Sequence, residues 1–141
     1  MDISPPPYKL YSARAIALAT FLGAPIAGCI LLAHNFRKLG DPRTASATVV
    51  WGIVITVVLL TVCFFLPKDF PNSVIPAAYT VTMYQFAKQR QAQTLSEHVK
   101  RGGALASAWA AAGIGLAMLC LILLCCFGVS YAIDIVQPNR S

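Results

Sequence analysis

The longest apolar run of the chain, residues 104–133, limits most strongly what this sequence can fold into. It contains no charged side chain. At about 1.5 Å per residue, a helix of this length exceeds the roughly 30 Å hydrocarbon core of a bilayer. Two further apolar runs, residues 13–33 and 47–66, are also long enough to cross. The sequence therefore predicts an all-α integral membrane protein, with residues 1–141 forming a single membrane domain.

The composition supports lipid as the surrounding medium. Hydrophobic residues make up 57% of the chain and charged residues 11%, against about 25% charged residues in soluble domains. The net charge is +6, and the basic residues flank the apolar runs, where they face anionic headgroups. The expected partner is therefore the lipid bilayer and not nucleic acid. The five cysteines fall within apolar runs, where cysteine acts as a small hydrophobe, so we expect no metal and no cofactor.

The stretch of residues 71–91 determines the predicted number of spans. It contains an uncharged segment that is short for a full span, but a helix starting at Ser73 can be extended by Lys88 and Arg90, whose long side chains reach the interface. We therefore expect a four-transmembrane-helix bundle. Its segments are a polar N-terminal segment (1–12), spans at 13–33, 47–66, 73–88 and 104–133, and inner basic segments at 34–44 and 88–103.

The alternative is three spans plus an interfacial amphipathic helix over residues 73–101. The positive-inside rule does not separate the two arrangements, because each places seven of the 11 basic residues on one side and four on the other. The loop at residues 67–72 is short and carries little charge, as expected on the outer side. The prediction is therefore four spans in a bacterial inner membrane, with both termini on the outer side.

A polar cluster at the inner interface is the candidate site. In the four-span arrangement the two histidines meet there, whereas three spans would place them on opposite sides. Such a cluster can bind an anionic headgroup or the acidic face of a partner. The simpler interpretation is that these residues mark helix ends at the interface. The candidates are His34, Asn35, Arg37, Lys38, His98, Lys100 and Arg101.

Small residues at helical spacing indicate two faces on which helices can approach closely. The first lies in the first apolar run and the second in the last. Together these helix-packing candidates are Ala24, Gly28, Ala106, Ala110, Gly113 and Ala117.

The residues available for chemistry point away from catalysis and ion coupling. No acidic residue falls within a predicted span, whereas proton-coupled transporters usually need an ionisable group at depth. The sequence shows no Ser-His-Asp set, phosphate-binding loop or carboxylate pair. If the protein has any enzymatic activity, we expect it to be lipid-headgroup chemistry at the inner interface.

The expected function is that of a non-enzymatic accessory, assembly or structural subunit of a membrane complex or homo-oligomer, with a membrane-protein partner or self-association. One alternative is a membrane-resident immunity protein against a membrane-directed toxin. The other is a lipid-binding or permeation role at the basic inner face.

Overall fold

The computed structural model describes residues 5–67, 71 and 73–136. Four helices follow one another: α1 (Ala13–Lys38), α2 (Pro42–Phe65), α3 (Val74–Lys100) and α4 (Ala108–Val136). The all-helical bundle is confirmed. By length and composition, α1, α2 and α4 are long and apolar enough to cross a membrane. The predicted 73–88 span lies within the longer and more polar α3, which is not among these three.

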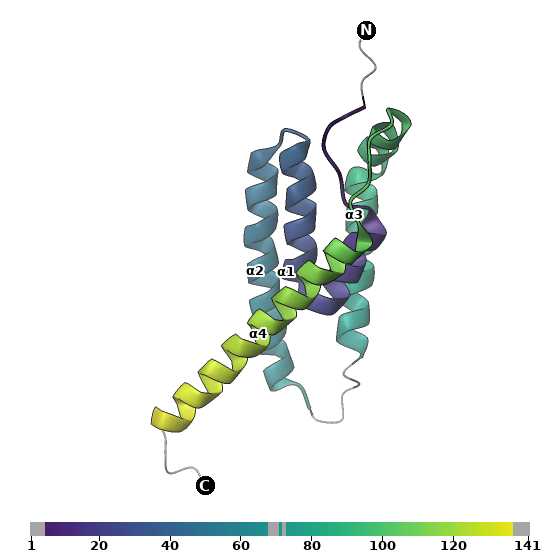
Figure 1. The fold of residues 1–141 in the computed structure, drawn as a ribbon. Coiled ribbons are helices and arrows are strands. Elements are labelled where there is room, and N and C mark those ends of the chain that lie inside the picture. Colours follow the sequence, from purple (N-terminus) through teal and green to yellow (C-terminus); the bar gives the residue numbers. More distant parts are fainter. Residues whose placement is uncertain (1–4, 68–70, 72, 137–141) are drawn as a thin grey trace.

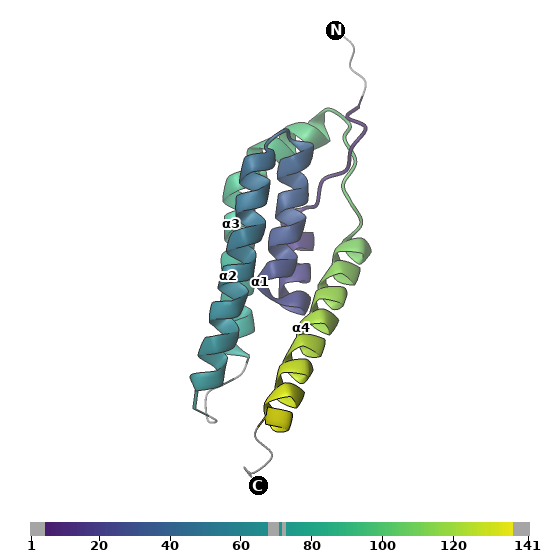
Figure 2. The ribbon, with the colours of Figure 1, turned by 90° about the vertical axis from the view of Figure 1, so that its left-hand side faces the viewer.

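Helix α1 is folded back on itself. Its regular geometry is interrupted at Gly23 and Ala24, ahead of Pro25. The chain descends through a first arm, residues 13–22, and returns through a second arm, residues 25–38 (Figures 1 and 2). As a result, Tyr11 and Asn35 are hydrogen-bonded although they are 24 residues apart, a separation of about 36 Å in a straight helix.

The reversal has a local cause and a tertiary one. Ala24 has φ 61° and ψ 177°, a region populated almost solely by glycine. Pro25 has no N–H and starts the second arm, where a free N–H would otherwise be exposed. The next free amide, that of Ile26, donates to the hydroxyl oxygen of Thr56 on α2 at 3.1 Å. A side chain of a neighbouring helix therefore accepts the hydrogen bond that the broken helix cannot form within itself.

This fold-back corrects one sequence prediction. A continuous helical span over residues 13–33 is wrong, because the two ends of α1 meet at the same end of the bundle. The N-terminal segment and the end of α4 lie at opposite ends of the bundle (Figure 1), and the placement of both termini on the outer side of a membrane stays a prediction. Helix α3 runs alongside α1, and its last turns lean across the bundle end (Figure 2). The choice between four spans and three spans plus an interfacial helix over residues 73–101 stays a prediction.

The α1 hairpin is the centre of the bundle. Within the described residues, every close helix–helix contact involves α1. Its arms supply most of the core, and α3 and α4 contribute one buried alanine each, Ala87 and Ala111. Glycines allow the closest approaches. A Cβ added at Gly52 of α2 would lie 2.6 Å from the Cβ of Cys29, and one at Gly115 of α4 would lie 2.9 Å from the Ala19 carbonyl oxygen.

The turn between α1 and α2 follows local rules. Gly40 has φ 84° and ends α1, as its position in the sequence predicts. Asp41 is the N-cap of α2, and its side chain accepts a hydrogen bond from the Thr44 amide at 3.0 Å. Pro42 then begins the helix, five residues before the predicted start of the second span, because an N-terminal proline is compatible with the first turn.

Candidate functional site

One end of the bundle gathers polar residues from four segments, and we call it the basic end. It consists of the N-terminal segment 5–12, the α1–α2 turn, the last turns of α3 and the loop 101–107. The N-terminal segment binds the loop through backbone hydrogen bonds: the Leu10 amide donates to the Ala104 carbonyl at 3.4 Å, and the Ala106 amide donates to the Leu10 carbonyl at 2.8 Å. Leu10 itself is buried.

Asn35 holds the centre of the basic end and is completely buried. Its side-chain oxygen accepts a hydrogen bond from the Tyr11 amide at 2.8 Å, and its Nδ2 donates to the Tyr11 carbonyl at 2.8 Å. The same Nδ2 donates to Oε1 of Gln91 on α3 at 2.7 Å. One amide side chain therefore joins both ends of α1 to α3. This is the role of an internal structural clamp, with no part of Asn35 left for an outside ligand.

His98 is also buried, with an exposed fraction of 4%. Its ring stacks on Tyr8 with centroids 5.1 Å apart, and Nε2 lies 3.2 Å from the Ala104 carbonyl oxygen. Gly103 passes directly over the imidazole, so closely that an added Cβ would meet the ring. His98 therefore anchors the N-terminal segment and the loop to α3.

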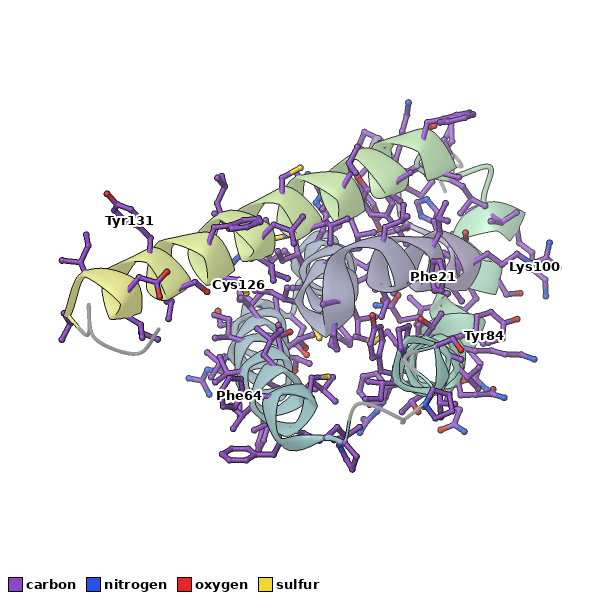
Figure 3. All side chains as sticks on the ribbon, turned by 90° about the horizontal axis from the view of Figure 1, so that it is seen from below. Phe21, Phe64, Tyr84, Lys100, Cys126 and Tyr131 are labelled. Carbon is purple, nitrogen blue, oxygen red and sulfur yellow. The ribbon has the colours of Figure 1, made fainter. Side chains whose placement is uncertain are left out.

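The remaining candidates of the predicted cluster are exposed. His34 contacts the Tyr11 ring edge-on, with centroids 5.4 Å apart. His34 and His98 are therefore brought to the same end, each against a tyrosine of the N-terminal segment. The exposed basic members are Arg37, Lys38, Lys100 and Arg101, and Figure 3 shows Lys100 pointing outward.

The predicted cluster thus divides into two parts with different chemistry. Asn35 forms a buried polar clamp with Tyr11 and Gln91, and the buried His98 contacts Tyr8 and the Ala104 carbonyl beside it. The exposed residues form a positively charged rim that can attract anionic headgroups or an acidic surface. Within the described part of the chain, no group of three or more His, Cys, Asp or Glu side chains is placed to hold a metal ion.

The rim is larger than the sequence predicted, because the hairpin brings the start of α1 to this end. Nine of the 11 basic residues lie in or close to the basic end; the other two, Lys68 and Arg140, lie outside the described residues. The nine are Lys9, Arg14, Arg37, Lys38, Arg43, Lys88, Arg90, Lys100 and Arg101.

The helix-packing candidates differ in burial: those on α1 are buried or half-buried, whereas most of those near α4 are exposed. Gly28 is buried, and an added Cβ would meet the Thr20 hydroxyl on the opposite arm. Ala24 is the half-buried apex of the hairpin. On α4 the buried small residues are Ala111 and Gly115.

The predicted α4 face is instead largely turned outward. Ala106 is half-buried in the loop before α4, whereas Ala110, Gly113 and Ala117 are exposed. A Cβ added at Gly113 would have no other atom within 4 Å.

Sequence reasoning missed Tyr8, Tyr11 and Gln91 as partners in this site. A usable signal existed for Gln91, because Gln91 and His98 are seven residues apart and so share one face of a helix. No comparable signal existed for the tyrosines, whose position depends on the reversal of α1.

Comparison of the chain with protein-family models, with curated proteins and with solved structures gave no match.

Proposed function

We propose that this protein is an integral membrane protein with its basic end in the cytoplasm, and that it acts without catalysis as an accessory or assembly subunit. In this orientation the N-terminus lies on the cytoplasmic side and the C-terminus on the outer side, whereas the sequence analysis expected both termini on the outer side. A bacterial inner membrane remains the proposed location.

Charge segregation supports this orientation. With α1 treated as a straight span, the basic residues divide seven to four. With the hairpin, all nine basic residues of the described part of the chain lie in or close to the basic end. Basic residues near helix ends favour the cytoplasmic side, so this strong asymmetry favours a cytoplasmic basic end. The exposed apolar surfaces of α2 and α4 would then face lipid or protein.

The observation that carries the association role is the outer face of α4. This helix packs on α1 through Ala111 and Gly115, and its second half extends away from the other helices, as the outlying position of Tyr131 in Figure 3 shows. The small residues Ala110, Gly113 and Ala117 remain exposed on the opposite side. Small residues allow a second helix to approach closely in a membrane, so this face suits a partner helix.

Cross-linking in native membranes followed by purification in mild detergent tests the proposal. We expect a cross-linked species larger than the monomer, and we expect Gly113→Leu to reduce its yield several-fold without changing the unfolding temperature. Val58→Leu, on the exposed surface of α2, is the matched control and should leave the yield unchanged. A strictly monomeric protein with no co-purifying partner would contradict the association role.

A further inference from the structure

We propose that the groove between α2 and α3 binds one acyl chain of an anionic phospholipid from the leaflet at the basic end, with Arg90 holding the phosphate. This inference rests on the membrane placement proposed above and adds a specific lipid site to it.

The groove exists because α2 and α3 both pack on α1 but not on each other. It encloses about 330 Å³. Its floor is Pro25 and Cys29 of the second arm, and its walls include Trp51 of α2 and Tyr79 and Phe86 of α3. Trp51 and Phe86 are partly exposed, so the groove opens sideways, toward the position that lipid would occupy.

The length of the groove matches one leaflet. On α2 it extends from Thr48 to Leu59, about 16 Å at the rise of an α-helix. Half of the bilayer hydrocarbon core is about 15 Å. The groove starts near the basic end and finishes beside the apex of the α1 hairpin, where Pro25 and Tyr79 lie. A single chain entering from the basic-end leaflet would therefore fill the groove and reach the bilayer midplane.

The chemistry of the groove is that of a lipid site with a charged entrance. Its lining is almost entirely apolar, as hydrocarbon requires. At its upper end the guanidinium of Arg90 lies 5.5 Å from the centroid of the Phe86 ring, so a lining residue and a cation are in direct contact. The basic end, with its exposed Arg37, Lys38, Lys100 and Arg101, lies beyond this entrance. An arginine in this position can bind a phosphate through two hydrogen bonds, and the surplus of positive charge favours an anionic headgroup.

The two tryptophans of the chain provide the test, because Trp51 lines the groove whereas Trp109 lies on α4 with an exposed fraction of 87%. Trp109→Phe and Trp51→Phe each leave a single reporter. Each full-length variant is placed in phosphatidylcholine vesicles that contain increasing amounts of dibrominated phosphatidylglycerol or dibrominated phosphatidylcholine, and tryptophan quenching is measured.

We expect half-maximal quenching of Trp51 at an about five-fold lower fraction of brominated phosphatidylglycerol than of brominated phosphatidylcholine, as one added cation contact predicts. Arg90→Gln should bring this ratio close to one. Glu97→Gln, which also changes one charge on the same helix but away from the groove, should preserve it. Trp109 should be quenched equally by both lipids.

The proposal would be overturned if half-maximal quenching of Trp51 required the same fraction of brominated phosphatidylglycerol as of brominated phosphatidylcholine. Quenching at Trp109 without quenching at Trp51 would overturn it as well, since a second copy or another protein would then cover the groove. Absence of quenching at both tryptophans would contradict both lipid binding in the groove and the proposed membrane placement.

Discussion

The Asn35 side chain forms two hydrogen bonds with the backbone of Tyr11, 24 residues earlier, and both are 2.8 Å long. This pair closes the ends of α1 on each other in the same way that backbone hydrogen bonds close a hairpin. A third hydrogen bond, to Gln91, ties the closed hairpin to α3. This relationship places the N-terminal segment beside the α1–α2 turn, at the basic end of the bundle.

Asn35→Ala should lower the free energy of unfolding by about 2 kcal/mol, because it leaves the buried Tyr11 backbone groups and Gln91 without their partners. Denaturant or thermal unfolding in detergent measures the change. Arg37→Ala, two residues away and exposed, is the control and should have little effect. Equal stabilities of the two variants would show that the clamp does not hold the hairpin closed.

Ala24→Gly should stabilise the protein by about 1 kcal/mol. The substitution removes the strain of a positive φ at a non-glycine residue, which exceeds the extra conformational entropy that glycine loses on folding. Ala17→Gly in the first arm is the matched control and should instead destabilise by about 1 kcal/mol, because glycine is a poor helix former. Destabilisation by Ala24→Gly would contradict the reversal at this residue.

The contact between Gly28 and Thr20 can be tested by a double-mutant cycle. Gly28→Ala should lower the free energy of unfolding by about 2 kcal/mol, because its Cβ meets the Thr20 hydroxyl. Combining it with Thr20→Ala should recover about 1 kcal/mol as coupling energy. Gly113→Ala, where the Cβ would have no other atom within 4 Å, should be neutral or slightly stabilising. Strict additivity of the two substitutions would mean that the arms do not touch here.

The extent to which the sequence predicted the fold depended on whether the information was local. The helical character of α2, α3 and α4 followed from apolar runs, a proline-rich loop and Gly40 as a helix end. The reversal of α1 did not follow, because residues 13–33 satisfy the length and hydropathy of a straight span, and Pro25 is tolerated in such a helix. The reversal depends on contacts with Gln91 and Thr56, which are 56 and 30 residues from their partners.

The candidate site was also predicted only in part, because some of its contacts depend on residues far apart in the sequence. Both histidines and the basic residues were expected at one inner interface, and the structure brings them to one end of the bundle. The equal charge division under both topologies could not decide between them, although the positive-inside rule usually gives a clear asymmetry. The division of the cluster into a buried clamp and an exposed rim required tertiary contacts, because nothing in the sequence distinguishes the buried Asn35 from the exposed His34 beside it.

The start of α2 should be sensitive to acid. Hydrogen bonds from the side chain and backbone of Thr44 lower the pKa of the Asp41 carboxyl below its ordinary value of 3.8. Because the folded-state pKa is the lower one, this cap stabilises the protein fully above pH 3.8, and the stabilisation is lost as the pH falls through the lowered pKa. The difference in unfolding temperature between the natural protein and Asp41→Ala should therefore shrink between pH 6 and pH 2.5. A difference independent of pH would contradict the charged cap.

The hairpin and the proposed orientation together make a prediction about labelling. In a variant with its five cysteines replaced, a membrane-impermeant maleimide should label Asp134→Cys in intact cells, because α4 ends on the side of the bundle opposite the basic end (Figure 1). Lys9→Cys and Ser96→Cys should be labelled only after the membrane is permeabilised, since both lie at the basic end. In the four-span arrangement a straight α1 would place Lys9 and Ser96 on opposite sides, so labelling of Lys9→Cys but not of Ser96→Cys in intact cells would contradict the hairpin. Labelling of both, with Asp134→Cys protected, would keep the hairpin and reverse the orientation, because Lys9 and Ser96 would still share one side of the membrane.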